Sequence, residues 1–311
     1  MTNGFKSIRW IIGLFLVVLL AEGCAQNLPA IREFSQATVV ASSSFDTIAD
    51  DIPKSCIRRV DAEEGFKGAR IVVVDDSVEF SKEYKDKLST CDALKESLNG
   101  IMAANGVLKG YAQAIGQLAS DGAVTFTSEM GALEASLRGI NIGGDRPFEG
   151  PKAKAVSELA RFLSNAAVRG YRQKELKETI ETANPYLENL IDGLIAVSGD
   201  YQAVLRGEEQ QVRNVQVNLV IESEKPENKG RIQEREMDER LFATRREMEI
   251  IESKRRAVED YKTVLKKISE THGELYKNKD QLNSQALIPL VEDYAKQLIP
   301  LINSIKEAFA R

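Results

Sequence analysis

Apolar residues recur at three- and four-residue spacing along most of this chain, which is the spacing of a buried helical face. The first such stretch runs from Leu28 to about Glu64, and the longest runs from Arg231 to about Leu282. Further stretches cover 77–122, 127–138, 152–182, 186–222 and 284–310. The pattern therefore predicts an almost wholly helical chain.

A few positions interrupt the helical pattern. Pro53 predicts a kink or a break in the first helix, and Asn184-Pro185 predicts a helix boundary. The β-branched run from Ile71 to Val74 is the one strand-like stretch that the pattern indicates. The Gly- and Pro-rich segment GINIGGDRPFEGP, residues 139–151, is the best candidate for a linker.

Long helices cannot bury their apolar stripes alone, so neighbouring helices must lie alongside them. Short turns between long helices indicate antiparallel packing. We therefore predict an all-α fold, an elongated antiparallel helical bundle with coiled-coil-like long helices. Residues 24–311 form a single elongated helical domain in this interpretation, with a sub-boundary near 140–151 and a charged helical hairpin over about 186–282.

The amino terminus has the layout of a secretory signal. Lys6 and Arg9 precede an uncharged run from Trp10 to Leu20, and small residues follow that run. The apolar run is shorter than the roughly 20 residues that a permanent membrane-spanning helix needs. The layout therefore predicts export.

The tetrapeptide Ala21-Glu22-Gly23-Cys24 resembles the lipobox of bacterial lipoproteins, although Ala21 stands where that family prefers Leu. The resemblance implies that residues 1–23 are a removed signal peptide and that Cys24 carries the lipid. Because Ala25 rather than Asp follows the cysteine, it also implies the outer membrane, with the protein facing the periplasm. The alternative is a cut by ordinary signal peptidase after Gly23 or Ala25, which leaves a soluble periplasmic protein.

Two further cysteines, Cys56 and Cys91, remain once Cys24 is assigned to the lipid. Both lie on apolar stripes, and folding the first two long helices back on each other brings them to about the same level. In an oxidising compartment they can form a disulfide. The alternative is a pair of unbonded buried thiols.

The net charge of the chain bears on the class of partner. Removing residues 1–23 changes the formal net charge from −5 to −6, and an acidic chain argues against a nucleic-acid partner.

His272 is the only histidine, and it falls on the apolar stripe of its helix. A multi-histidine metal site or a His-based catalytic triad therefore lacks residues. We predict no catalytic site, no metal and no cofactor.

The segment from Arg231 to Asp280 carries 13 Lys and Arg against 12 Asp and Glu. Interleaved charges of both signs indicate a solvated helical face. Its basic clusters are alternatively candidate contacts to a partner or to lipid headgroups. These candidates are Arg245, Arg246, Lys254, Arg255 and Arg256.

These features favour a non-enzymatic function. The leading hypothesis is a lipid-anchored periplasmic spacer or interaction module of an envelope assembly, with a protein partner in the envelope. The alternative is a helical protein that binds or remodels a membrane surface. A third hypothesis, an enzyme or small-ligand binder, would rely on carboxylates, Tyr and Lys alone. The sequence leaves the partner and the oligomeric state open.

Overall fold

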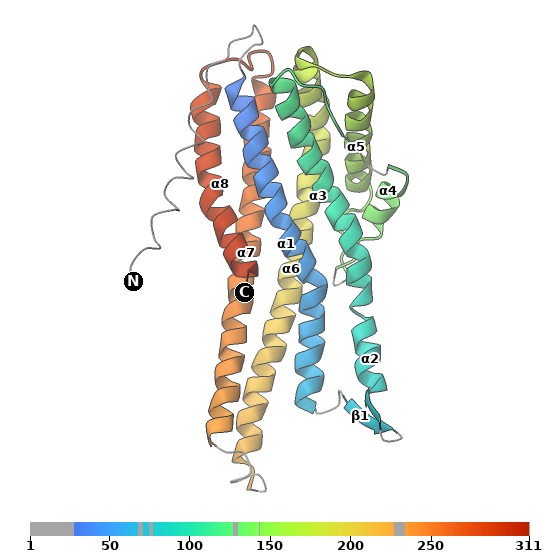
Figure 1. The fold of residues 1–311 in the computed structure, drawn as a ribbon, viewed down its shortest axis with the longest axis vertical. Coiled ribbons are helices and arrows are strands. Elements are labelled where there is room, and N and C mark those ends of the chain that lie inside the picture. Colours follow the sequence, from blue (N-terminus) through green and yellow to red (C-terminus); the bar gives the residue numbers. More distant parts are fainter. Residues whose placement is uncertain are drawn as a thin grey trace, which may run out of the picture.

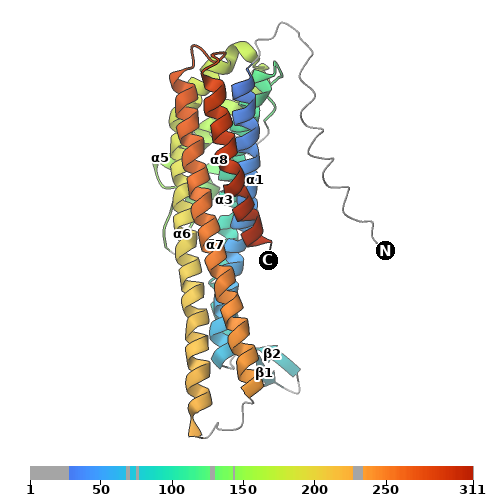
Figure 2. The same cartoon turned by 90° about the vertical axis from the view of Figure 1, so that its left-hand side faces the viewer.

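The computed structural model describes residues 28–67, 71–74, 77–126, 130–142, 144–226 and 234–310. Long helices lie side by side along one axis, which confirms the predicted all-α elongated bundle (Figures 1 and 2). In chain order the elements are α1 (Pro29–Lys67), β1 (Ile71–Val74), β2 (Ser77–Phe80), α2 (Lys82–Ser89), α3 (Asp92–Ala119), α4 (Met130–Arg138), α5 (Pro151–Arg169), the 3-10 turn η2 (Gln173–Glu175), α6 (Leu176–Glu224), α7 (Glu234–Lys277) and α8 (Leu287–Phe309).

Helices α1 and α3 form an antiparallel pair. The Ser35 hydroxyl donates to the Ala112 carbonyl at 2.7 Å, and the Asn105 amide donates to the Ser42 carbonyl at 2.9 Å. As α1 advances, its partner position on α3 therefore moves back toward the start of α3. The same register continues to the far end of the pair, where Cys56 meets Cys91.

Helix α6 runs in the same direction as α1, and α7 returns against both. Asp51 of α1 lies beside Tyr201 of α6, and Arg58 lies beside Glu208, one further step along both helices. Helix α8 follows a short connection and packs on α1 and α7 (Figure 2). The α6–α7 hairpin thus ends at the pole opposite to the start of α1 (Figure 1).

A continuous apolar core runs through the bundle. Each long helix supplies one stripe; on α7 the fully buried members include Val258, Tyr261, Leu265 and Leu275. Tyr261 stacks on Phe45 of α1, with ring centroids 4.6 Å apart. Burying one such large apolar side chain contributes about 1.5–3 kcal/mol, so these stripes hold the helices together.

The predicted start of the second long helix, at Ser77, is wrong. Residues Ser77–Phe80 form β2, which pairs antiparallel with β1 so that Ile71 faces Phe80. The helix begins only at Lys82, where the Ser81 hydroxyl caps it by accepting the Tyr84 amide at 3.1 Å. A second break separates α2 from α3 at Thr90 and Cys91. Local strand pairing and the serine cap account for the shift.

One proline prediction needs correction. Helix α6 continues through Pro185, where a boundary was predicted, whereas at Pro53 a kink or a break was predicted and only the break is excluded, because α1 continues through it. The helix predicted over 152–182 instead ends at Arg169, where Gly170 adopts the left-handed conformation with φ of 64°. Around Pro185 the buried residues Ala183 and Leu187 keep the helix docked, so tertiary packing outweighs the local cost of the proline.

The segment predicted as a linker packs against the bundle. Ile140, Ile142 and Phe148 are all buried. A Cβ atom added at Gly193 of α6 would lie only 2.2 Å from the Phe148 ring, so this glycine lets the loop approach the helix closely. The loop is therefore held against α6.

Candidate functional site

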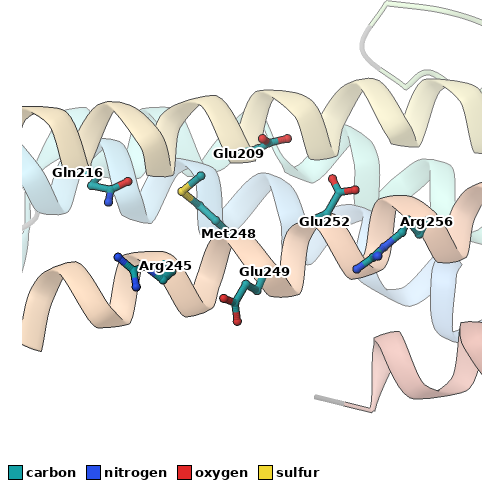
Figure 3. Close-up of a pocket in the computed structure, with 7 residues that line it drawn as sticks. All are labelled: Glu209, Gln216, Arg245, Met248, Glu249, Glu252 and Arg256. Atoms are coloured by element: carbon teal, nitrogen blue, oxygen red, sulfur yellow. The ribbon is translucent and has the colours of Figure 1, made fainter.

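An open groove of about 410 Å³ lies between α6 and α7, toward the end of the hairpin (Figure 3). Glu209 and Gln216 line it from α6, and Met248 extends from α7 toward α6. Charged residues of α7 complete the lining: Arg245, Glu249, Glu252 and Arg256. The groove thus places one apolar side chain, Met248, among charged and amide side chains.

The five basic residues that the sequence predicted as candidate contacts differ in their exposure. Arg245, Arg246 and Arg256 are exposed, and the first and last of them line the groove. Arg255 is half-buried and pairs with Glu209 at 2.7 Å and Glu252 at 3.1 Å. Arg255 therefore fastens α7 to α6, which leaves three exposed guanidinium groups as candidate contacts.

Lys254 is not a surface contact, so the prediction was wrong for this residue. Its side chain is buried, and its Nζ atom lies 3.0 Å from Asp51 Oδ1 and 3.1 Å from Oδ2. Lys254 lies three residues after the buried Ile251 and four residues before the buried Val258. Its side chain is therefore on the face of α7 that meets the core. It cannot reach a partner or a headgroup from there.

Lys254 belongs to a buried network that joins three helices. Arg58 of α1 donates both terminal nitrogens to the Asp51 carboxylate at 2.9 Å. The same guanidinium reaches Glu208 of α6 through Nε at 2.5 Å. The Ser55 and Tyr201 hydroxyls donate to Glu208 and Asp51 respectively. Each buried charge therefore has an opposite charge and a hydrogen-bond partner.

The network favours the charged forms of Asp51 and Arg58. Burial alone would raise the pKa of the Asp51 carboxyl, but Arg58, Lys254 and Tyr201 together hold that pKa below its usual value. Burial would lower the pKa of Arg58, but Asp51 and Glu208 raise it. Nearby, burial and the Glu208 charge raise the pKa of Glu247. This arrangement joins α1 to α6 and to α7 through paired charges.

His272 is buried in the seam between helices, as its place on the apolar stripe predicted. Its Nε2 lies 2.6 Å from the Tyr111 hydroxyl and its Nδ1 lies 3.1 Å from Asn184 Oδ1. Burial lowers the pKa of the imidazole to about 4. The ring is therefore neutral at physiological pH and has a partner for each nitrogen.

Cys56 and Cys91 lie at disulfide distance, with Sγ atoms 2.03 Å and Cα atoms 5.7 Å apart. The predicted pairing is confirmed in this respect. Cys24, the predicted lipid-bearing residue, lies outside the described residues, which begin at Leu28.

The described part of the chain shows neither a metal-binding cluster nor a membrane-spanning helix. No group of three or more His, Cys, Asp and Glu side chains lies close enough to hold a metal ion there. Among the same residues, no helix is both long and apolar enough to cross a membrane.

The sequence interpretation missed the buried network. Asp51 and Glu208 were not among the predicted site residues. Their partners on other helices, Lys254 for Asp51 and Arg58 for Glu208, lie 203 and 150 positions away in the chain. One signal was available. Glu208 continues the buried stripe of Tyr201, Leu205 and Val212 at three- and four-residue spacing, and Lys254 does so on α7. A charge on an apolar stripe needs a buried partner.

Comparisons of the chain with protein-family models, with curated proteins and with solved structures found no match. Function must therefore be argued from the residues themselves.

Proposed function

We propose that this chain is an exported, lipid-anchored helical protein of the bacterial envelope, which acts as a spacer and interaction module and not as an enzyme. Cys24 is the attachment point, and two acyl chains there would hold the protein stably on the outer membrane. The body faces the periplasm.

One geometric relationship carries the proposal. The described chain starts at Leu28, four residues after Cys24, at the pole where α1 begins (Figure 1). The α6–α7 hairpin ends at the opposite pole and carries the groove and the exposed arginines. A helix of 49 residues, such as α6, spans about 70 Å. An anchored molecule would hold its charged end at that order of distance from the membrane.

The chemistry of the polar interior also supports a structural role. His272 and the Asp51 network are buried and have partners within the protein, so neither presents a reactive group to a substrate. The disulfide clamps the far end of the α1–α3 pair, as suits a protein in an oxidising compartment.

Chemical crosslinking in intact cells tests this proposal. Purification of the crosslinked chain should recover a defined envelope protein in stoichiometric yield. Recovery of no protein partner across crosslinkers of different reach would contradict it.

Membrane-surface binding is a second candidate, because the exposed Arg245 lies 5.8 Å from the ring of the exposed Phe242 and has no acidic partner among the described residues. Co-sedimentation of the Cys24→Ala chain with anionic vesicles separates the two functions. The spacer predicts that the unacylated chain stays in the supernatant, whereas membrane binding predicts that it pellets with the vesicles and that salt reverses this.

A further inference from the structure

Four exposed apolar residues gather near the end of the α6–α7 hairpin. Val217, Val220 and Ile221 lie on one face of α6, and Phe242 lies on α7 with 66% of its surface exposed. We call these four residues the tip patch. The other large apolar residues exposed in the described chain stand on separate elements, as Val168 does on α5. A cluster of this kind marks an interaction site more often than a single exposed residue does.

The tip patch continues the groove between α6 and α7. Gln216 and Arg245 both line the groove. Val220 lies four residues after Gln216, and Phe242 lies three residues before Arg245, so both fall on the groove's face of their helices. The ion pair of Glu209 with Arg255 sets the antiparallel register of the two helices. Extending that register toward the hairpin end brings Val220 and Phe242 to nearly the same level.

Some charged side chains beside this surface form ion pairs and others do not. Glu209 pairs with Arg213 and Arg255, and Glu252 pairs with Arg255, so two arginines balance these two carboxylates. Arg245, Arg246 and Arg256 make no ion pair within the described part of the chain, and the Arg245 guanidinium lies 5.8 Å from the centre of the Phe242 ring. Glu249, the remaining acidic residue of the lining, also makes no ion pair within the described residues, so an occupant meets three unpaired arginines against one unpaired carboxylate.

We infer that the tip patch and the groove dock an amphipathic helix of a partner protein, with its apolar stripe on Val220, Phe242 and Met248 and its acidic flank against the three arginines. A helix laid in a groove needs only a few anchors at helical spacing, which matches this surface. The inference deepens the proposed function, because it names the surface and the chemistry of the partner.

Two other occupants fit less well. A second copy of the chain would need about 800 Å² from each molecule for a standard interface, and four side chains supply only part of that area. A membrane would meet the hairpin end first, and the last described residues of α6 and its C-cap are polar: Glu222, Ser223, Glu224 and Lys225. The tip patch lies on the side of the hairpin, where a helix can lie along it.

Site-specific photo-crosslinking in cells tests the inference. A photoreactive residue replaces Val220 in the full chain, and the same residue at Val168 serves as the control for a fully exposed apolar position. We expect a discrete protein product from position 220 only. Its crosslinked residue should map to a segment with apolar residues at three- and four-residue spacing flanked by Asp or Glu.

Two variants then test the recognition chemistry. Phe242→Asp and Arg245→Glu should each lower the yield of that product at least fivefold, whereas Lys266→Glu, an exposed control on the same helix, should leave it unchanged. Circular dichroism confirms that each variant remains helical.

Several outcomes would overturn the inference: no product above the Val168 control, a product with phospholipid, a product with a second copy, or a yield unaffected by Arg245→Glu. The readout reports contact at position 220 whether or not Cys24 carries lipid. A failure of lipid anchoring therefore remains distinguishable from a failure of this docking site.

Discussion

Lys254 and Asp51 stand 203 positions apart in the chain, yet the lysine Nζ lies 3.0 Å from the aspartate Oδ1 inside the bundle. The contact fixes α7 on α1 at one level, and Arg58 fixes α6 at the same level through Glu208. A shift in helix register would separate these buried charges from their partners, which is strongly destabilising. The network therefore sets the relative heights of three long helices.

Removing one partner of this network should destabilise the fold. Lys254→Met leaves the Asp51 carboxylate buried with Arg58 and Tyr201 as its remaining partners, and we expect a loss of about 2–4 kcal/mol in the free energy of unfolding. Urea denaturation measures it. Arg245→Met, an exposed change on the same helix, should stay within about 0.5 kcal/mol of wild type. Equal effects of the two variants would show that the network contributes nothing specific.

The disulfide should stabilise the chain through its unfolded state. Cys56 and Cys91 are separated by 35 positions, and closing a loop of this size contributes about 3–4 kcal/mol. Double replacement by serine should therefore lower the free energy of unfolding by that amount, whereas Cys24→Ala should leave it unchanged. Peptide mapping without reductant that finds free thiols at both positions in exported protein would refute the bridge.

The free energy of unfolding should decrease as the pH is lowered, because His272 is buried. Burial lowers the pKa of the folded imidazole to about 4, against 6.5 in the unfolded chain. Below pH 6.5 the unfolded state therefore binds a proton that the folded state does not, and stability falls until about pH 4. The expected loss between pH 7.5 and pH 4.5 is about 2–3 kcal/mol.

A glutamine variant isolates this contribution. Asp200 acts in the opposite direction, because burial and Asp145 raise its pKa to about 6. The comparison is therefore between wild type and His272→Gln, measured by urea denaturation at both pH values. The variant should lose about 2 kcal/mol less than wild type on acidification. Parallel pH profiles would contradict the assignment.

Close packing of α4 on α3 should make one glycine intolerant of substitution. A Cβ atom at Gly100 would lie 2.5 Å from the Ser136 carbonyl oxygen of α4, and backbone cannot move aside easily. Gly100→Ala should therefore cost about 1–3 kcal/mol. Gly106→Ala on the same helix meets no atom within 4 Å and should stabilise by about 0.5–1 kcal/mol. Thermal melts of both variants check the opposite signs.

Most of the fold was predictable from periodicity. The stripe on α7 predicted a helix over 231–282, and the structure places it at Glu234–Lys277. The pairing of Cys56 with Cys91 followed from their places on two stripes about a common connector. Helix ends were less predictable, because caps such as Ser81 and packing around Pro185 decide them.

The candidate site was predictable only in part. Arg245, Arg246 and Arg256 are exposed as expected, but the sequence did not distinguish them from the buried Lys254. That distinction depends on which face of α7 meets α1, and the partners that reveal it are distant in the chain. The tip patch was missed for a related reason. Its residues follow the spacing of a buried stripe, and only the bundle shows that they are exposed.

The central claim is that export ends with lipid on Cys24, and intact-mass analysis of the purified mature chain with palmitate labelling tests it most directly. We predict a product that begins at Cys24, carries acyl mass and incorporates the label, and a Cys24→Ala chain that does neither. An unlabelled product cut after Gly23 or Ala25, or one that still begins at Met1 and fluoresces through Trp10, would contradict the account.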